Sequence, residues 1–165
     1  MTALATVCLL LTVVPVSEMA LPALAGVMLI PVVVELERRY ALTAYGTVSL
    51  LALFLVPSWE PKLLFIGFFG YYPVIKALIE RRCRRATEWV LKLALFNVAA
   101  VLVYGALFAF FSLDPAEFAI GGRTMLWLWL LLGNAVFALY DIGLTQAISR
   151  YTVAVGPRLR KLFRF

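Results

Sequence analysis

The stretch from Gly67 to Arg85 constrains the fold most, because an apolar run passes directly into a dense block of arginines. Its sequence is GFFGYYPVIKALIERRCRR, and the block consists of Arg81, Arg82, Arg84 and Arg85. Short loops that are rich in Lys and Arg stay cytoplasmic when a membrane protein inserts. The stretch therefore predicts a membrane-spanning helix whose C-terminal end faces the cytoplasm.

Composition places the whole chain in the same class of protein. Its 165 residues are 64% hydrophobic and 15% charged, whereas the apolar share of soluble domains is typically about half. The net charge of +6 comes from arginines at the ends of apolar runs, so topology and anionic lipids explain it without a nucleic-acid partner. We expect a multi-pass, all-α integral membrane protein of the cell membrane, with membrane lipids around it.

Six apolar runs approach the length of about 20 residues that a bilayer requires. The second contains Pro31, where we expect a kink because proline removes a helical hydrogen bond. The sequence thus predicts one six-helix membrane domain over residues 1–165. The expected transmembrane helices are about 3–16, 20–35, 40–56, 62–80, 89–111 and 124–150.

The basic residues are distributed unequally between the two sides of this arrangement. Eleven Lys and Arg side chains fall on the side of the arginine block, and Lys62 and Arg123 fall on the other. Both termini are therefore expected to be cytoplasmic. The basic tail 151–165 has two interpretations: an anchor on the anionic inner leaflet, or a docking segment for a cytoplasmic partner.

Absent residue types and motifs argue against an enzyme. The chain has no histidine and neither of the glycine-rich phosphate-binding motifs, so the usual general base and a bound nucleotide are not expected. Asp114 and Glu117 share a loop while Asp141 stands alone in a helix, which leaves no carboxylate set for Mg²⁺. We expect no catalytic residues, no metal and no cofactor.

Polar side chains inside the apolar runs are the main functional candidates, because such groups are costly in a bilayer. Helical spacing predicts that either Lys76 or Lys92 pairs with Asp141, and the pair could be structural or a functional, proton-sensitive gate. Alternatively, both lysines could extend to the interface and leave the aspartate as the one deep charge. The predicted intramembrane network comprises Tyr72, Lys76, Lys92, Asn97 and Asp141.

Pro73 predicts irregular geometry in the fourth helix, because it denies the Phe69 carbonyl its helical donor. Gly67 and Gly70 open the same region to close packing or bending. The alternatives are an ordinary kink and a helix break that contributes to a binding cavity.

Aromatic and polar residues on the outer side could bind a small organic molecule. The alternative is that the tryptophans form an interfacial belt and the loop charges are solvated. Because Trp127 and Trp129 are two residues apart on a helix, only one of them can face the bundle. The candidate substrate-binding residues are Trp59, Glu60, Glu117, Arg123, Trp127 and Asn134.

The six short helices and a second helix of the type ALPALAGVMLIP (20–31) resemble the S components of energy-coupling factor (ECF) transporters. The similarity is one of architecture over the whole chain. It implies an ECF S-component-like bundle that captures a vitamin-like small-molecule ligand on the outer side. It also implies partners, namely a transmembrane T component and two ATPase subunits that supply the energy.

An alternative from another class is a non-transporting membrane scaffold that gathers partners. In length and helix count the chain is also similar to the rod-shape protein MreD. A scaffold needs exposed interaction surfaces but no ligand cavity, so a ligand-binding pocket would distinguish the two interpretations.

Overall fold

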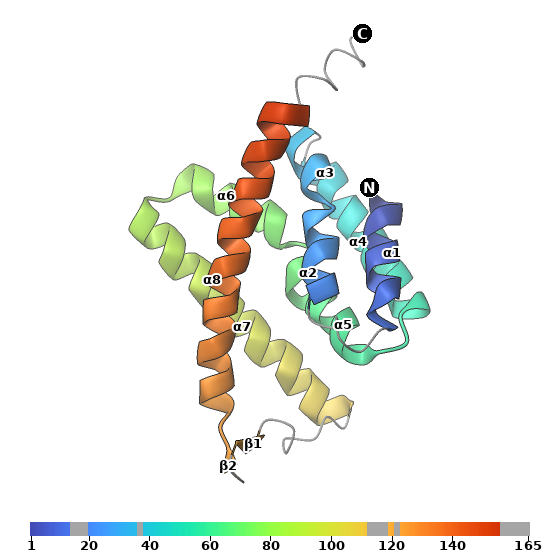
Figure 1. Cartoon of the computed structure of the whole chain (residues 1–165), viewed down its shortest axis with the longest axis vertical. Helices are drawn as coiled ribbons and strands as arrows, with labels where there is room; N and C mark the ends of the chain where they lie inside the picture. Colours follow the sequence, from blue (N-terminus) through green and yellow to red (C-terminus); the bar gives the residue numbers. More distant parts are fainter. Residues whose placement is uncertain (14–19, 36–37, 112–118, 121–122, 156–165) are drawn as a thin grey trace.

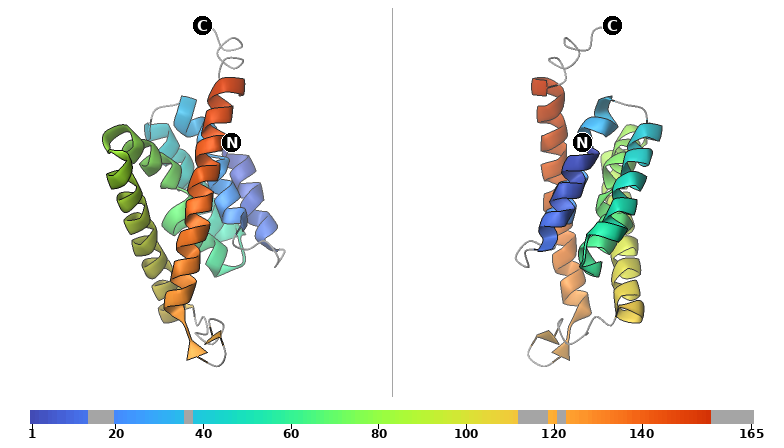
Figure 2. Two further views of the ribbon diagram at one scale, coloured as in Figure 1. Left: turned by 60° about the vertical axis from the view of Figure 1, so that its left-hand side comes forward. Right: turned by 90° about the vertical axis from the view of Figure 1, so that its right-hand side faces the viewer.

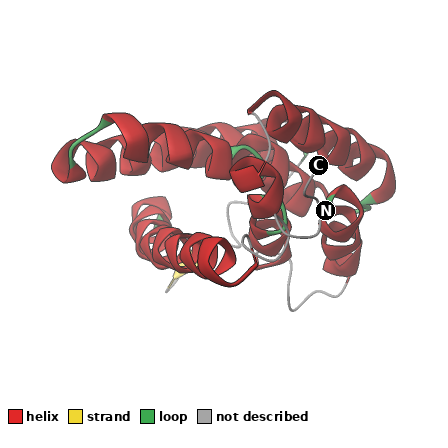
Figure 3. Cartoon of the chain, turned by 90° about the horizontal axis from the view of Figure 1, so that it is seen from above, coloured by secondary structure: helices red, strands yellow, loops and turns green. Residues whose placement is uncertain are grey.

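The computed structural model describes residues 1–13, 20–35, 38–111, 119–120 and 123–155. It is built almost entirely of helices (Figure 3), which confirms the all-α class. A two-residue antiparallel ladder pairs Ile120 with Arg123 just before the last long helix. In chain order the elements are α1 (Thr2–Leu10), η1 (Leu11–Val13), α2 (Ala20–Val27), α3 (Ile30–Glu35), α4 (Arg38–Leu55), α5 (Trp59–Leu64), η3 (Phe65–Phe69), α6 (Tyr72–Arg82), α7 (Arg85–Phe110), β1 (Ala119–Ile120), β2 (Arg123–Thr124), α8 (Leu126–Arg150) and η5 (Tyr151–Val155).

Three helical segments within the described residues are long and apolar enough to cross a membrane. They are Trp59–Arg82, Arg85–Phe110 and Leu126–Val153. Two further apolar helices, Ala20–Glu35 and Arg39–Leu55, are shorter. Length and composition therefore support membrane crossing for three segments. The expected six spans would also have to include these two shorter helices and α1.

The predicted kink in the second apolar run is present. The run is divided into α2 and α3, and Leu29 N–H bonds Gly26 O at 3.1 Å across the turn between them. Pro31, in the first turn of α3, has no N–H to offer the carbonyl of Val27, and this missing bond accounts for the division.

The irregular geometry predicted near Pro73 is also present, and it takes the form of a π-helix. The segment η3 lies between α5 and α6, and Gly70 N–H bonds Phe65 O at 2.8 Å, five residues back. Single π turns inside helices often occur at functional sites. A β-carbon on Gly70 would lie 2.6 Å from the Tyr45 ring, so α4 packs against this break only because position 70 is glycine.

The long helices run between two ends of the molecule (Figures 1 and 2). One end, here called the arginine end, carries the α6–α7 connection and the C-terminal end of α8. The opposite end, here called the tryptophan end, carries the start of α5, the end of α7 and the start of α8. The end of α6 and the end of α8 thus lie at one end of the molecule, and the end of α7 and the start of α8 lie at the other.

The buried side chains form two clusters that meet at the π-helix. Phe65 belongs to a cluster with Leu9, Ala25 and Val48, from α1, α2 and α4. Phe68 belongs to a second cluster, which contains residues of α3, α6, α7 and α8. In this cluster the rings of Phe96 and Phe137 stack 4.8 Å apart. The helix break therefore joins two packed parts of the molecule.

Candidate functional site

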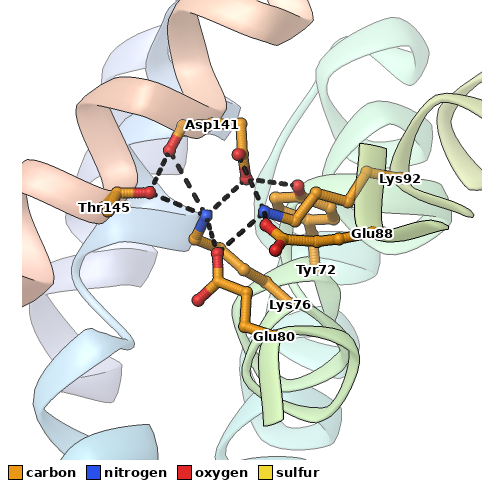
Figure 4. A network of polar contacts seen from close by, with 7 residues as sticks. All are labelled: Tyr72, Lys76, Glu80, Glu88, Lys92, Asp141 and Thr145. Atoms are coloured by element: carbon orange, nitrogen blue, oxygen red, sulfur yellow. Dashed lines mark hydrogen bonds and ion pairs between the residues drawn. The ribbon is translucent and has the colours of Figure 1, made fainter. Parts of the chain in front are cut away.

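A network of charged and polar side chains connects α6, α7 and α8 near the arginine end (Figure 4). Each helix presents its members at intervals of four residues, which places them on one face. The network contains Tyr72, Lys76 and Glu80 from α6, Glu88 and Lys92 from α7, and Asp141 and Thr145 from α8.

The carboxylate of Asp141 is the acceptor at the centre of this network, and Asp141 is only 2% exposed. Its Oδ1 lies 2.6 Å from Lys76 Nζ and accepts the Tyr72 hydroxyl at 2.5 Å. Its Oδ2 lies 2.9 Å from Lys92 Nζ. The predicted ion pair is confirmed, and it includes both lysines rather than one of them.

The ammonium of Lys76 has a partner for each of its three N–H donors. Besides Asp141, it contacts Thr145 Oγ1 at 2.8 Å and Glu80 Oε1 at 2.6 Å. Lys76 is fully buried. The alternative in which this side chain extends to the interface is therefore wrong.

Lys92 is held in the same way by three carboxylates. Its Nζ lies 2.7 Å from Glu80 Oε1, 2.6 Å from Glu88 Oε1 and 2.9 Å from Asp141 Oδ2. The side chain of Glu80 is 34% exposed and that of Glu88 is 17% exposed, against 1% for Lys92. The two glutamates thus form a partly exposed acidic rim over two buried ammonium groups.

This arrangement holds three helices together by charge. Removing one partner of a buried ion pair leaves an uncompensated charge, a loss of about 3–5 kcal/mol. Since both ammonium groups are saturated with acceptors, the network fixes the positions of α6, α7 and α8 relative to one another.

A second polar contact joins α7 to α8, through a reciprocal pair of amides. Asn97 Nδ2 donates to Asn134 Oδ1 at 2.9 Å, and Asn134 Nδ2 donates to Asn97 Oδ1 at 3.0 Å. Each Nδ2 also donates to the carbonyl four residues earlier in its own helix. The structure therefore places Asn134, a predicted ligand-binding residue, in a helix contact, and places Asn97 there rather than within the charged network.

The predicted residues Trp59 and Glu60 lie together at the tryptophan end. The ring centroids of Trp59 and Phe111 are 4.4 Å apart. Glu60 Oε1 accepts the Tyr104 hydroxyl at 3.1 Å, which connects α5 to α7. Trp59 remains 46% exposed, so an aromatic face and a carboxylate are found at one corner of the molecule.

Lys62 belongs to this corner, although sequence reasoning assigned it only to the outer side. The residue is 5% exposed, its Nζ lies 4.0 Å from the centre of the Trp59 ring, and it donates to Leu53 O at 3.3 Å. Lys62 forms no ion pair within the described residues, since all the ion pairs found there belong to the network around Asp141. The sequence carried no signal for this burial, because a lysine at the end of an apolar run can equally extend its ammonium group to the interface.

Of the other predicted ligand-binding residues, Trp127 lies on α8 and Arg123 on β2. Trp127 is 67% exposed and Trp129 is 38% exposed, so neither ring is buried in the bundle, although Trp129 is the more sheltered. Arg123 is placed through its backbone, in the β1–β2 ladder. Glu117 lies outside the described residues.

Comparison of the chain with protein-family models, curated proteins and solved structures finds no match. Over the described part of the chain, no group of His, Cys, Asp and Glu side chains is placed to hold a metal ion. The chemistry on which a function can be argued is therefore that of the charged network, the amide pair and the corner around Lys62.

Proposed function

We propose that this chain is a multi-pass protein of the cell membrane and the substrate-binding subunit of a small-molecule uptake transporter. The observation that carries the proposal is Lys62, a buried ammonium group beside an aromatic face, with no carboxylate partner among the described residues. Buried charges are normally paired. The anionic group of a ligand is the partner that this position favours.

The surroundings of Lys62 suit a small organic anion. Stacking on Trp59 and Phe111 would hold an apolar body, and the hydroxyl of Tyr104 and carboxylate of Glu60 provide polar contacts nearby. Ligand-binding pockets typically combine aromatic walls with a few placed polar groups, and this corner supplies both kinds of side chain. The present partners of Lys62 compensate it only in part, because a cation over a ring gains about 0.5–2 kcal/mol.

In this proposal the chain crosses the membrane six times, with both termini in the cytoplasm. The asymmetry of the basic residues supports it, as does the location of the α6–α7 connection and the end of α8 at one end of the molecule (Figure 1). The shorter apolar helices would then cross the bilayer as part of the bundle. The tryptophan end, with Lys62, faces outward.

The resemblance to ECF S components supports the choice of partners. A transmembrane T component and ATPase subunits would supply the energy, and the chain itself would supply the ligand site. The network around Asp141 would then keep α6, α7 and α8 in a fixed arrangement at the side facing the ATPases.

The alternative function is that of a non-transporting scaffold similar to MreD. The amide pair and the Asp141 network favour it, since their ammonium and amide groups are satisfied within the protein and need no ligand. A scaffold, however, gains nothing from a buried lysine without a counter-charge.

Native mass spectrometry of the protein purified in mild detergent from its own host tests the ligand-binding function. We expect a small-molecule adduct on the wild-type protein that is lost in Lys62→Met and weakened in Glu60→Gln. Arg150→Gln, at the opposite end, is the control and should keep the adduct. An adduct equally abundant in all four proteins, or in none, would contradict the proposal.

A further inference from the structure

The hydroxyl of Tyr140 on α8 is buried and has no hydrogen-bond partner within the described residues. Its ring packs edge-on against Phe69 at 5.1 Å. Buried polar groups in native proteins nearly always have a partner, from the protein or from an ordered small molecule. This hydroxyl therefore requires an explanation.

A carbonyl in the helix break has lost the donor that a regular helix would give it. Residue 73 is proline, so no N–H is present four residues after Phe69 to bond the Phe69 carbonyl. Two other carbonyls of the break accept hydrogen bonds from side chains: Ile66 O accepts the Tyr45 hydroxyl and Gly67 O accepts the Tyr71 hydroxyl, each at 2.7 Å.

The Tyr140 hydroxyl and the Phe69 carbonyl converge on the same glycine of α2. A β-carbon built on Gly26 would lie 2.5 Å from Phe69 O and 3.1 Å from Tyr140 Oη. The two oxygens are thus close to a common point, yet they do not bond to each other. Glycine at position 26 is what lets α2 approach both oxygens, because a side chain there would press on a backbone carbonyl.

We propose that a neutral hydroxylic oxygen, from water or from a hydroxyl group of a ligand, bridges Tyr140 Oη and Phe69 O beside Gly26. Such an oxygen donates one hydrogen bond to the carbonyl and accepts one from the tyrosine. A carboxylate is disfavoured because it has no proton for the carbonyl. A metal ion is disfavoured because two neutral oxygens are fewer ligands than hard cations take.

The bridge gives the helix break a binding role that is separate from the corner around Lys62. It joins α2, η3 and α8, which belong to the two packed parts of the molecule. The inference does not depend on the proposed transport function, because a bridging water would be present in a scaffold as well.

Thermal unfolding of purified protein in lipid nanodiscs tests the bridge. If Tyr140 Oη is bridged, Tyr140→Phe lowers the melting temperature by an amount similar to that of Tyr45→Phe and Tyr71→Phe, whose hydroxyls donate to carbonyls of the break. If the hydroxyl is unbonded, removing it leaves the melting temperature unchanged or raises it. The second result would overturn the proposal.

Extensive dialysis before the measurement distinguishes the two sources of the oxygen. A bridging water keeps the effect of Tyr140→Phe after dialysis, whereas a ligand hydroxyl makes the effect disappear while the two control variants keep theirs. A density map that shows Tyr140 Oη bonded directly to Phe69 O, with no group between them, would also overturn the proposal.

Discussion

Asp141 Oδ1 on α8 lies 2.6 Å from Lys76 Nζ on α6, although the two residue numbers differ by 65. Neither residue has appreciable contact with solvent. A carboxylate and an ammonium placed this deeply stabilise the protein only while both are present, because either one alone is a buried charge without compensation. This relationship makes the packing of α6 against α8 sensitive to single substitutions.

We predict that Asp141→Ala lowers the free energy of unfolding by about 3–5 kcal/mol, because Lys76 and Lys92 both lose their common partner. Thermal unfolding and the yield of monodisperse protein in detergent would measure this loss. Thr145→Val is the matched control on the same face of α8, and it should lose only about 1 kcal/mol. Equal stability of Asp141→Ala and wild type would show that the network contributes nothing.

The reciprocal amide pair should behave as a unit. Asn97→Leu leaves Asn134 without its partner, and the expected loss is about 0.6–1.7 kcal/mol, as for other hydrogen bonds between membrane helices. The double variant with Asn134→Leu should lose less than the sum of the two single variants. Additive losses in this double-mutant cycle would mean that the two amides do not interact.

The glycine at the helix break should not tolerate a side chain. Gly70→Ala would place a β-carbon 2.6 Å from the Tyr45 ring, and we expect a loss of about 1–3 kcal/mol from overpacking. Gly105→Ala on α7 is the control, since a β-carbon there meets nothing within 4 Å. Thermal unfolding of both variants checks the prediction, which is wrong if the two behave alike.

The predicted orientation, with the arginine end in the cytoplasm, can be tested with cysteines on either side of the segment Trp59–Arg82. In a Cys8→Ser background, Ser58→Cys at the tryptophan end should react with an impermeant maleimide added to intact cells. The native Cys83 in the arginine block should react only after the cells are opened. The opposite pattern would invert the topology and place Lys62 on the cytoplasmic side.

The helical class and the two helix irregularities could be predicted from the sequence, because apolar run length and proline positions are local signals. Pro73 correctly indicated an irregular helix, and Asp141 indicated a lysine partner. The contacts between side chains of different helices depend on how each helix is rotated about its axis. Tertiary packing sets this rotation, and no local sequence signal reports it. The packing places both Lys92 and Tyr72 against Asp141. It also pairs Asn134 with Asn97, so that Asn134 is not left for a ligand.

The predicted ligand-binding residues also show that residue type alone does not predict which side chains lie together. Residue type alone suggested that tryptophans and loop charges could gather around a ligand. The structure places Trp59 and Glu60 at one corner and leaves Trp127 exposed on α8. The burial of Lys62 depends on how α5 packs against the end of α4, and no sequence pattern reports that contact.

Purification of the tagged protein from its own membrane, with quantitative mass spectrometry of everything that remains bound, tests the central claim most directly. We predict stoichiometric association with a transmembrane subunit and two ATPase subunits, together with uptake of the ligand found on the wild-type protein. Uptake should be lost in Lys62→Met without loss of the complex. Association with cell-shape or envelope proteins, and no ATPase, would contradict the transporter and favour the scaffold.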